Sequence, residues 1–306
     1  MIDSLRAYVK RSPLNGLLLL LLLVFTGAAL FSFIGFVIAE LTLGIPLLTR
    51  PMLLEDLTDP ELIPALRVMQ VLQAFGMLIL PAVIYMYVSV SWSGVKNMFR
   101  IPQRQSVLLG IALFMVGFPF INYLAQWNAG WELPSAFADW IRSKEEQAGS
   151  LTEMFLHMPH VGLLLFNLFM IALLPAVGEE LIFRGIVQRG LHRQFGNAHV
   201  AIWVAAIVFS AIHMQFFGFV PRMLMGVAMG YLFYWSGNLW YPVIAHFTNN
   251  ALAVVISFGI QHGSVDPEIE MAGMDNAALA AFSLVFCLML LFLFRQLQRG
   301  GMTADH

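Results

Sequence analysis

Charged residues are scarce in this chain. They make up 11% of its 306 residues, whereas a soluble domain has about 25%. Hydrophobic residues make up 59%, so the composition excludes an ordinary soluble domain and indicates a protein with many membrane-spanning segments. The formal net charge is −2, and this lack of excess Lys and Arg argues against nucleic acid as a partner.

Cysteine is almost absent as well. Cys287 is the single one, which excludes an intrachain disulfide and a zinc site built from cysteines. The chain also lacks the Gly-x-Ser-x-Gly pattern of serine hydrolases and the His-Glu-x-x-His pattern of zinc proteases. No internal repeat is visible, which weakens the hypothesis of a transporter built from inverted repeats.

Eight apolar segments are long enough to cross a bilayer as helices, at about 20 residues each with slightly shorter ones tolerated. We therefore expect an all-α fold. It would be a polytopic bundle of about eight transmembrane helices, forming a single membrane domain over residues 1–306 within the lipid bilayer. The segments are 14–40, 63–90, 106–127, 160–188, 198–217, 219–235, 240–260 and 277–297.

Lys and Arg gather in alternate connections between these segments, and the positive-inside rule then puts both termini in the cytosol. We expect a multi-pass protein of a bacterial cytoplasmic membrane. The polar segment 129–158 would lie outside, where the stretch 136–147 predicts a short amphipathic surface helix. The residues assigned to the cytosolic side are Arg6, Lys10, Arg11, Lys96, Arg100, Arg104, Arg189, Arg193, Arg295 and Arg299.

Two adjacent carboxylates, Glu179 and Glu180, lie inside the fourth apolar segment. One charge at membrane depth costs at least about 2.5–3.5 kcal/mol, so such a pair indicates a functional site. Glu180 and Arg184 are four residues apart with the acid first, the favourable order for an ion pair on a helix. Glu179 lies about 100° around the helix from Glu180, which leaves its carboxylate free to act as a base. Gly178 and Gly185 are expected to mark close helix contacts.

Two histidines are expected at the same depth in the membrane as the carboxylate pair. Glu179 and His213 lie 17 residues before and after Gly196, so two helices meeting at that turn put both side chains about 25 Å from it. His246 and Asn250 are four residues apart on one helix face, where both side chains can donate a hydrogen bond to one oxygen.

A carboxylate, two histidines and an amide at one depth suit hydrolysis. Glu179 would take a proton from water, which His213 would help to hold. His246 and Asn250 would stabilise the oxyanion of the tetrahedral intermediate, at about 3–4 kcal/mol per donor. A zinc site made by Glu179, His213 and His246 is the alternative. We favour a metal-free site, because a metal-bound Glu179 cannot also be the base.

Three motifs on successive membrane helices resemble those of a known family. Glu179-Glu180-x-x-x-Arg184, Phe209-x-x-x-His213 and His246-x-x-x-Asn250, in this order, are similar to the CAAX protease and bacteriocin-processing (CPBP, or Abi) family of intramembrane endopeptidases. The resemblance covers residues 160–260, which would form a catalytic four-helix core. It implies a conical cavity open to the cytosol, with Glu180, Arg184 and Phe209 in supporting positions. Members are described both as metalloproteases and as metal-free glutamate enzymes.

The expected substrate is a peptide or protein that enters from the membrane or the cytosol. Two other functions stay open. One is an ion- or proton-coupled transporter that uses Glu179 and Glu180 as its binding site. The other is a non-proteolytic member of the family that binds a partner. Peptide cleavage would support the endopeptidase, and ion flux would support the transporter.

Overall fold

The computed structural model describes residues 2–55, 59–133 and 135–303. Helices joined by turns make up these residues, and no strand occurs in them, so the all-α prediction is confirmed. Six helices are long and apolar enough to cross a membrane by length and composition, as expected for a multi-pass integral membrane protein. They are Leu14–Leu43, Pro60–Ser89, Arg104–Ala129, Val161–Phe195, Trp240–Gln261 and Ala277–Arg299.

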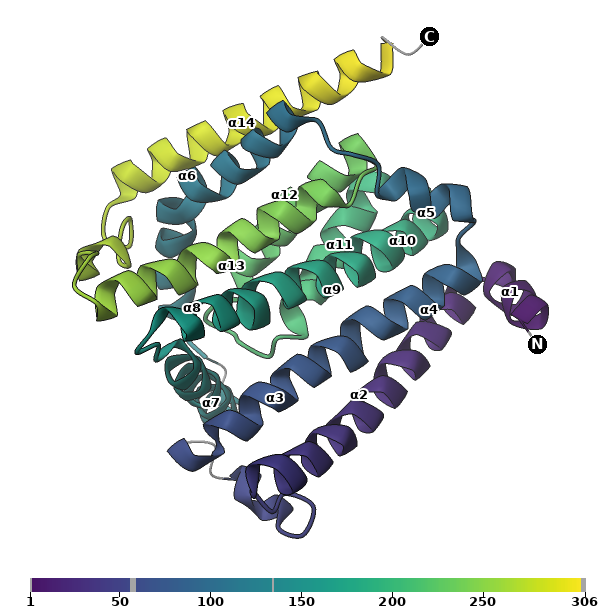
Figure 1. The fold of residues 1–306 in the computed structure, drawn as a ribbon. Helices are drawn as coiled ribbons and strands as arrows, with labels where there is room; N and C mark the ends of the chain where they lie inside the picture. The colour runs from purple at the N-terminus through teal and green to yellow at the C-terminus, as the bar shows by residue number, and fades with distance from the viewer. Residues whose placement is uncertain (1, 56–58, 134, 304–306) are drawn as a thin grey trace.

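These six long helices run roughly side by side across the molecule (Figure 1). Neighbours in this layer also make the main helix contacts: α2 with α3, α9 with α13, α13 with α6, and α6 with α14. The helix bounds are α1 Ile2–Arg11, α2 Pro13–Leu43, α3 Ile63–Gln73, α4 Leu80–Ser89, α5 Trp92–Met98, α6 Arg104–Ala129, α7 Ala138–Leu156, α8 Val161–Asn167, α9 Leu174–Ile182, α10 Arg189–Phe195, α11 Ala198–Ala211, α12 Phe219–Ser236, α13 Trp240–Gln261 and α14 Ala277–Thr303.

The predicted count of eight spans is reduced to six. The other two segments form α11 and α12, which pack against each other and are not among the six candidate spans. Helix α11 has 14 residues and ends at Ala211, six residues before the predicted end at 217. The loop 212–218 follows, and it contains Met214 with φ of +55°. A non-glycine residue rarely adopts this left-handed conformation, and it turns the chain back into α12.

The helix that carries the two glutamates is irregular. Its α-helical parts α8, α9 and α10 are separated by two π-helical segments, Leu168–Leu173 and Phe183–Gln188. Such π-segments widen a helix by one residue and are common at functional sites. Here they flank α9 on both sides, and they set the direction in which Glu179 and Glu180 project.

Two glycines bring a neighbouring helix close to α9. A Cβ atom on Gly178 would lie 2.6 Å from the Cβ of Leu78, and one on Gly185 would lie 2.5 Å from the Cε of Met86. Leu78 and Met86 belong to the same helix, Pro60–Ser89. A side chain at position 178 would collide with Leu78, so this helix approaches α9 closely only because residue 178 is glycine, whereas at position 185 the flexible tip of Met86 could move aside. The prediction of close helix contacts at Gly178 and Gly185 is confirmed.

The two ends of the layer differ in charge. Helices α1 and α5, the end of α10 and the C-terminal end of α14 lie at one end, to the right in Figure 1. They carry the Lys and Arg residues assigned to the cytosol. Helix α7 and the connection from α13 to α14 lie at the opposite end. Helix α7 falls in the segment 129–158 and is longer than the predicted stretch 136–147. It contacts α3 and α13, and its Ile141 is buried.

Candidate active site

Glu180 is fully buried, and one of its carboxylate oxygens contacts both Arg184 and His246. Its Oε1 accepts a hydrogen bond of 2.8 Å from Nη1 of Arg184 and lies 2.9 Å from Nδ1 of His246. The buried guanidinium of Arg184 also donates from Nη2 to the carbonyl oxygen of Gly226 on α12. It lies 5.1 Å from the centre of the Phe209 ring. The expected ion pair between Glu180 and Arg184 is present, and it ties α9 to α12 and α13.

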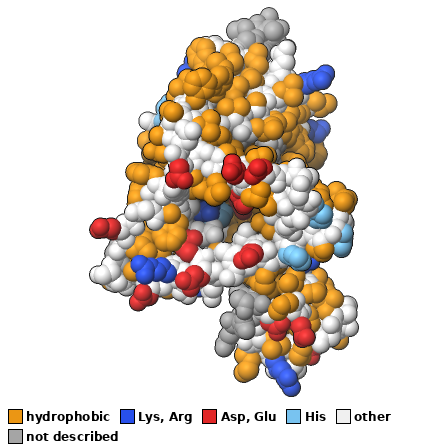
Figure 2. Space-filling view, turned by 90° about the vertical axis from the view of Figure 1, so that its left-hand side faces the viewer, with side chains coloured by type: hydrophobic (Ala, Val, Ile, Leu, Met, Phe, Trp, Pro, Cys, Tyr) orange, Lys and Arg blue, Asp and Glu red, His pale blue; other side chains and the backbone are white. Residues whose placement is uncertain are grey.

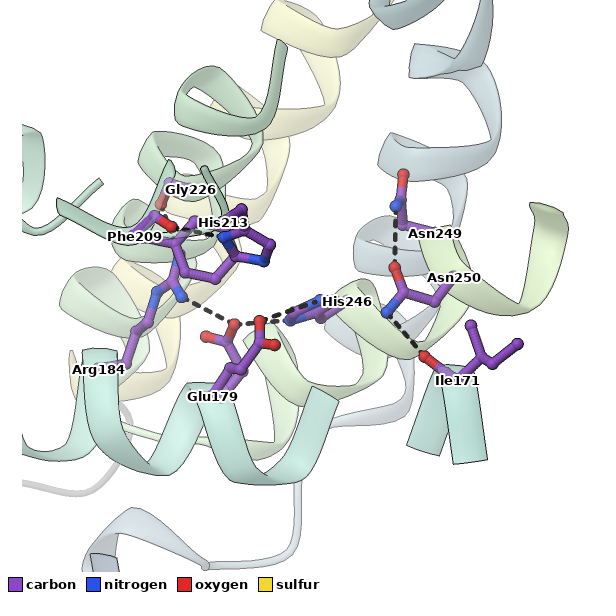
Figure 3. A network of polar contacts seen from close by, with 10 residues as sticks. Ile171, Glu179, Arg184, Phe209, His213, Gly226, His246, Asn249 and Asn250 are labelled. Carbon is purple, nitrogen blue, oxygen red and sulfur yellow. Dashed lines mark hydrogen bonds and ion pairs between the residues drawn. The ribbon is translucent and has the colours of Figure 1, made fainter. Parts of the chain in front are cut away.

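His246 on α13 contacts both carboxylates, and Figure 3 shows its ring beside Glu179. Its Nδ1 faces Glu180, and its Nε2 lies 3.8 Å from Oε2 of Glu179. An ionised Glu180 can only accept hydrogen bonds, so Nδ1 of His246 carries a proton and Nε2 points toward Glu179. Oε2 of Glu179 is buried and has no hydrogen-bond partner in the described structure. Oε2 of Glu180 is likewise buried without a hydrogen-bond partner, so the two carboxylates differ in that Oε1 of Glu180 holds both Arg184 and His246. That Glu179 is the base stays a prediction.

His213 follows the end of α11 and lies next to Phe209 (Figure 3). Its Nδ1 lies 2.7 Å from the carbonyl oxygen of Phe209. This contact gives Nδ1 a proton and leaves Nε2 of the neutral ring as an acceptor. The Phe209 ring packs edge-on against the rings of both histidines, with centroids 5.1 Å from His213 and 6.0 Å from His246. Phe209 therefore lies at the centre of the cluster and holds the two imidazoles apart.

Asn250 lies one helical turn beyond His246 but is directed elsewhere. Its Nδ2 donates to the carbonyl oxygen of Ile171 at 3.2 Å, and its Oδ1 accepts from Asn249 at 3.1 Å. Pro175 explains this contact, because proline has no N–H to offer the carbonyl four residues before it. The structure therefore brings Glu179, Glu180, His213 and His246 together, and it does not bring Asn250 into hydrogen-bond contact with any of them.

No group of three or more His, Cys, Asp or Glu residues with the arrangement of a metal site occurs in the parts of the chain that the structure describes. The set Glu179, His213 and His246 therefore does not fit the ligand sphere of zinc in this arrangement. The Nδ1 atoms of the two histidines are held by Glu180 and by the Phe209 carbonyl, and this leaves the Nε2 atom of each ring as the one that faces the site.

A hollow opens on the face that carries α7. Figure 2 shows basic and histidine atoms deep inside it and Asp and Glu side chains around its rim. This is the end of the layer opposite to the chain ends. A separate cavity of about 350 Å³ lies at the other end, lined by residues of α5, α10 and α12 that include Asn97, Arg189, His192 and Tyr234. That cavity does not reach the carboxylates.

Two features of the site were not predicted from the sequence. The contact of Glu180 with His246 joins residues 66 positions apart, and no local spacing signals it. The second feature is Arg222, which lies in the first turn of α12, four residues before the Gly226 carbonyl that accepts from Arg184. Its charge lies within electrostatic range of the Glu179 carboxylate. No motif in the sequence marks it.

Residues 161–252 match the sequence model of the family described as type II CAAX prenyl endopeptidase Rce1-like. The chain therefore contains an Rce1-like domain of the CAAX protease (CPBP) family over these residues, which include all three motifs. It is also similar to the uncharacterized protein YpbD of Bacillus subtilis (strain 168), with 29% identity over 90 residues. That match covers 28% of this chain and 43% of YpbD, so the chain spans less than half of the relative's length. No solved structure matches.

Proposed function

We propose that the protein is an intramembrane endopeptidase in which Glu179 activates water. One observation carries this proposal: a buried carboxylate oxygen of Glu179 without a partner faces a histidine that a second carboxylate holds in place. Membership of the matched region in the Rce1-like CAAX protease family supports the same reaction. The catalytic core would be residues 160–260 within a single membrane domain, 1–306, and the segment 129–158 would cover it from the outer side.

The reaction assigns a step to each side chain. Glu179 takes a proton from a water molecule, and the water oxygen attacks the peptide carbonyl carbon. Nε2 of His213 accepts a hydrogen bond from the same water, because its Nδ1 is occupied by the Phe209 carbonyl. The proton then passes from Glu179 to the leaving amine as the C–N bond breaks.

The developing oxyanion needs donors. With a proton on each ring nitrogen, His246 donates from Nδ1 to Glu180 and from Nε2 to the oxyanion, so Glu180 fixes the direction of the donor. Asn250 would be the second donor, as the family motif implies. For that role its amide must exchange the Ile171 carbonyl for the substrate, which makes this contact one that forms during the reaction.

The orientation in the membrane needs revision. Cytosolic termini and a cytosolic opening were both expected, but the hollow and the chain ends lie at opposite ends of the helices, so only one of the two can hold. The Lys and Arg distribution is the stronger indicator. We therefore propose cytosolic termini and an opening on the outer side, through which a peptide or protein substrate would enter.

Cysteine labelling tests this orientation. In a Cys287→Ser background, Asn97→Cys on α5 should react with an impermeant maleimide only after the cells are opened. Glu146→Cys on α7 and Glu270→Cys in the α13–α14 connection should react in intact cells, because all three native side chains are exposed and the last two share the side of the hollow. The reverse pattern would put the hollow in the cytosol.

The activity itself is tested with purified protein and a library of quenched fluorescent peptides. We expect cleavage at a defined bond, unaffected by chelators. The same protein in proteoliposomes should carry no ion flux above empty vesicles. Flux without cleavage would support the transporter instead, and zinc-dependent cleavage would overturn the metal-free mechanism.

A further inference from the structure

We propose that Arg222 is a carboxylate-binding residue for the substrate, positioned between the carboxylate of Glu179 and the opening of the hollow. This proposal rests on the proposed function, since it assigns a recognition element to the same site. It concerns the class of peptide that is cleaved: one that carries a carboxylate close to the scissile bond.

The guanidinium of Arg222 has unused hydrogen-bond capacity. Its Nη2 donates to Oε1 of Gln215 at 2.7 Å, whereas its Nη1 is buried and has no partner in the described structure. None of the ion pairs found among the described residues includes this arginine. A buried guanidinium N–H without an acceptor is costly, so the site favours an anion that supplies the missing oxygen.

The backbone around Arg222 is held from three sides. Asn128 accepts from the backbone N–H of Val220, Glu145 accepts from that of Phe217, and Ser210 donates to the carbonyl of Phe219. These contacts fix the loop and the first turn of α12. Pre-organisation of this kind lowers the entropy that is lost when a ligand binds.

The position of Arg222 relative to the catalytic groups follows from the helix. Gly226, whose carbonyl binds Arg184, lies one turn deeper on α12. Arg222 is therefore about 6 Å nearer to the start of α12 than this contact, and α12 begins next to α7. Gln215 accepts a hydrogen bond from Arg222, and Glu179, Glu145 and His213 lie within electrostatic range of its guanidinium. A substrate that reaches Glu179 from the hollow passes this side chain.

The surrounding charges limit which anion fits. Two carboxylates act on Arg222, and neither is in ion-pair contact with it. A planar, singly charged carboxylate matches the donors that remain on the guanidinium, and a doubly charged phosphate would be repelled more strongly by Glu145 and Glu179. Either the C-terminal carboxylate of a peptide or an Asp or Glu side chain supplies this group.

Matched substrates test the proposal. The peptide that the wild type cleaves fastest is prepared in its native form, with an amidated C-terminus, and with its Asp and Glu residues changed to Asn and Gln. Arg222→Gln should lower kcat/KM for the form that carries the recognised carboxylate by roughly 10- to 100-fold. It should lower kcat/KM for the corresponding neutral form less than about threefold. If the amidated peptide is the one that Arg222→Gln hardly affects, the recognised group is the C-terminal carboxylate. If it is the peptide with Asn and Gln, the recognised group is an Asp or Glu side chain.

Controls separate recognition from folding. Arg222→Lys keeps the charge and should restore part of the activity, and Arg142→Gln, on the exposed face of α7, should behave as the wild type. An equal loss of kcat/KM on all three peptides, or no loss on any, would overturn the proposal.

A binding measurement keeps the test independent of turnover. Saturation-transfer NMR compares N-acetyl-Ala-Leu-Leu as free acid and as amide, on Glu179→Gln and on Glu179→Gln/Arg222→Gln. The free acid should bind more tightly than the amide only where Arg222 is present. If no peptide is cleaved, the proposed function fails while this comparison still decides the carboxylate site; equal binding of acid and amide to Glu179→Gln would contradict it.

Discussion

Replacing Glu179 by Gln should abolish peptide cleavage and leave the fold intact. The substitution removes the base at nearly constant volume, and a positioned base contributes roughly 10²–10⁴-fold to the rate. Oε2 of Glu179 makes no hydrogen bond in the described structure, and its contact with Nε2 of His246 is long, at 3.8 Å, so we expect the helix packing to stay as it is. The measurement is kcat/KM on a cleaved peptide together with the thermal unfolding temperature in detergent.

The matched control for this variant is Glu146→Gln, which changes an exposed carboxylate on α7 in the same way. It should retain wild-type cleavage. Near-wild-type activity of Glu179→Gln would end the hypothesis that this carboxylate is the base, and a folded variant with wild-type unfolding temperature but no turnover would support it.

Replacing Glu180 by Gln should reduce both stability and activity. The variant leaves the buried guanidinium of Arg184 without its counter-charge, and breaking a buried pair in this way costs about 3–5 kcal/mol. It also weakens the contact that holds Nδ1 of His246, so the remaining folded protein should cleave slowly. Unfolding in detergent reports the first effect, and kcat/KM per folded molecule reports the second.

A double variant separates the two effects. Glu180→Gln/Arg184→Met removes both charges, so it should recover most of the lost stability, because no unpaired charge stays buried. It should not recover activity, since His246 still lacks its carboxylate partner. Recovery of both would mean that Glu180 serves only the ion pair with Arg184, as the helix spacing alone had suggested.

Local patterns in the sequence were sufficient for much of this structure. Apolar runs predicted the six long helices, and the four-residue spacing of Glu180 and Arg184 predicted an ion pair that forms at 2.8 Å. The equal distances of Glu179 and His213 from Gly196 likewise predict a common depth for these two side chains, and this stays a prediction. Each of these inferences depends on the regular rise and period of an α-helix.

The predictions failed where a helix stops being regular. Nothing in the apolar run 198–217 marks the end of α11 at Ala211. The chain beyond it is held by long-range contacts, from Phe217 to Glu145 on α7 and from Val220 on α12 to Asn128 on α6. The four-residue spacing put Asn250 beside His246, but Pro175 on another helix leaves the Ile171 carbonyl free to take its amide. The Glu180–His246 contact likewise depends on how α9 packs against α13. Such long-range effects are not encoded in the spacing of neighbouring residues.

The early end of α11 has a consequence for the surrounding lipids. Fourteen residues extend about 21 Å, whereas the hydrocarbon core of a bilayer is about 30 Å thick. The outer side of α11 is apolar and exposed at Val200, Trp203 and Ile207, so we expect acyl chains to contact it. A short apolar flank of this kind is a hydrophobic mismatch, which a bilayer relieves by thinning locally. We therefore expect the bilayer to be thinner beside α11, and the length of its acyl chains to affect the loop that carries His213.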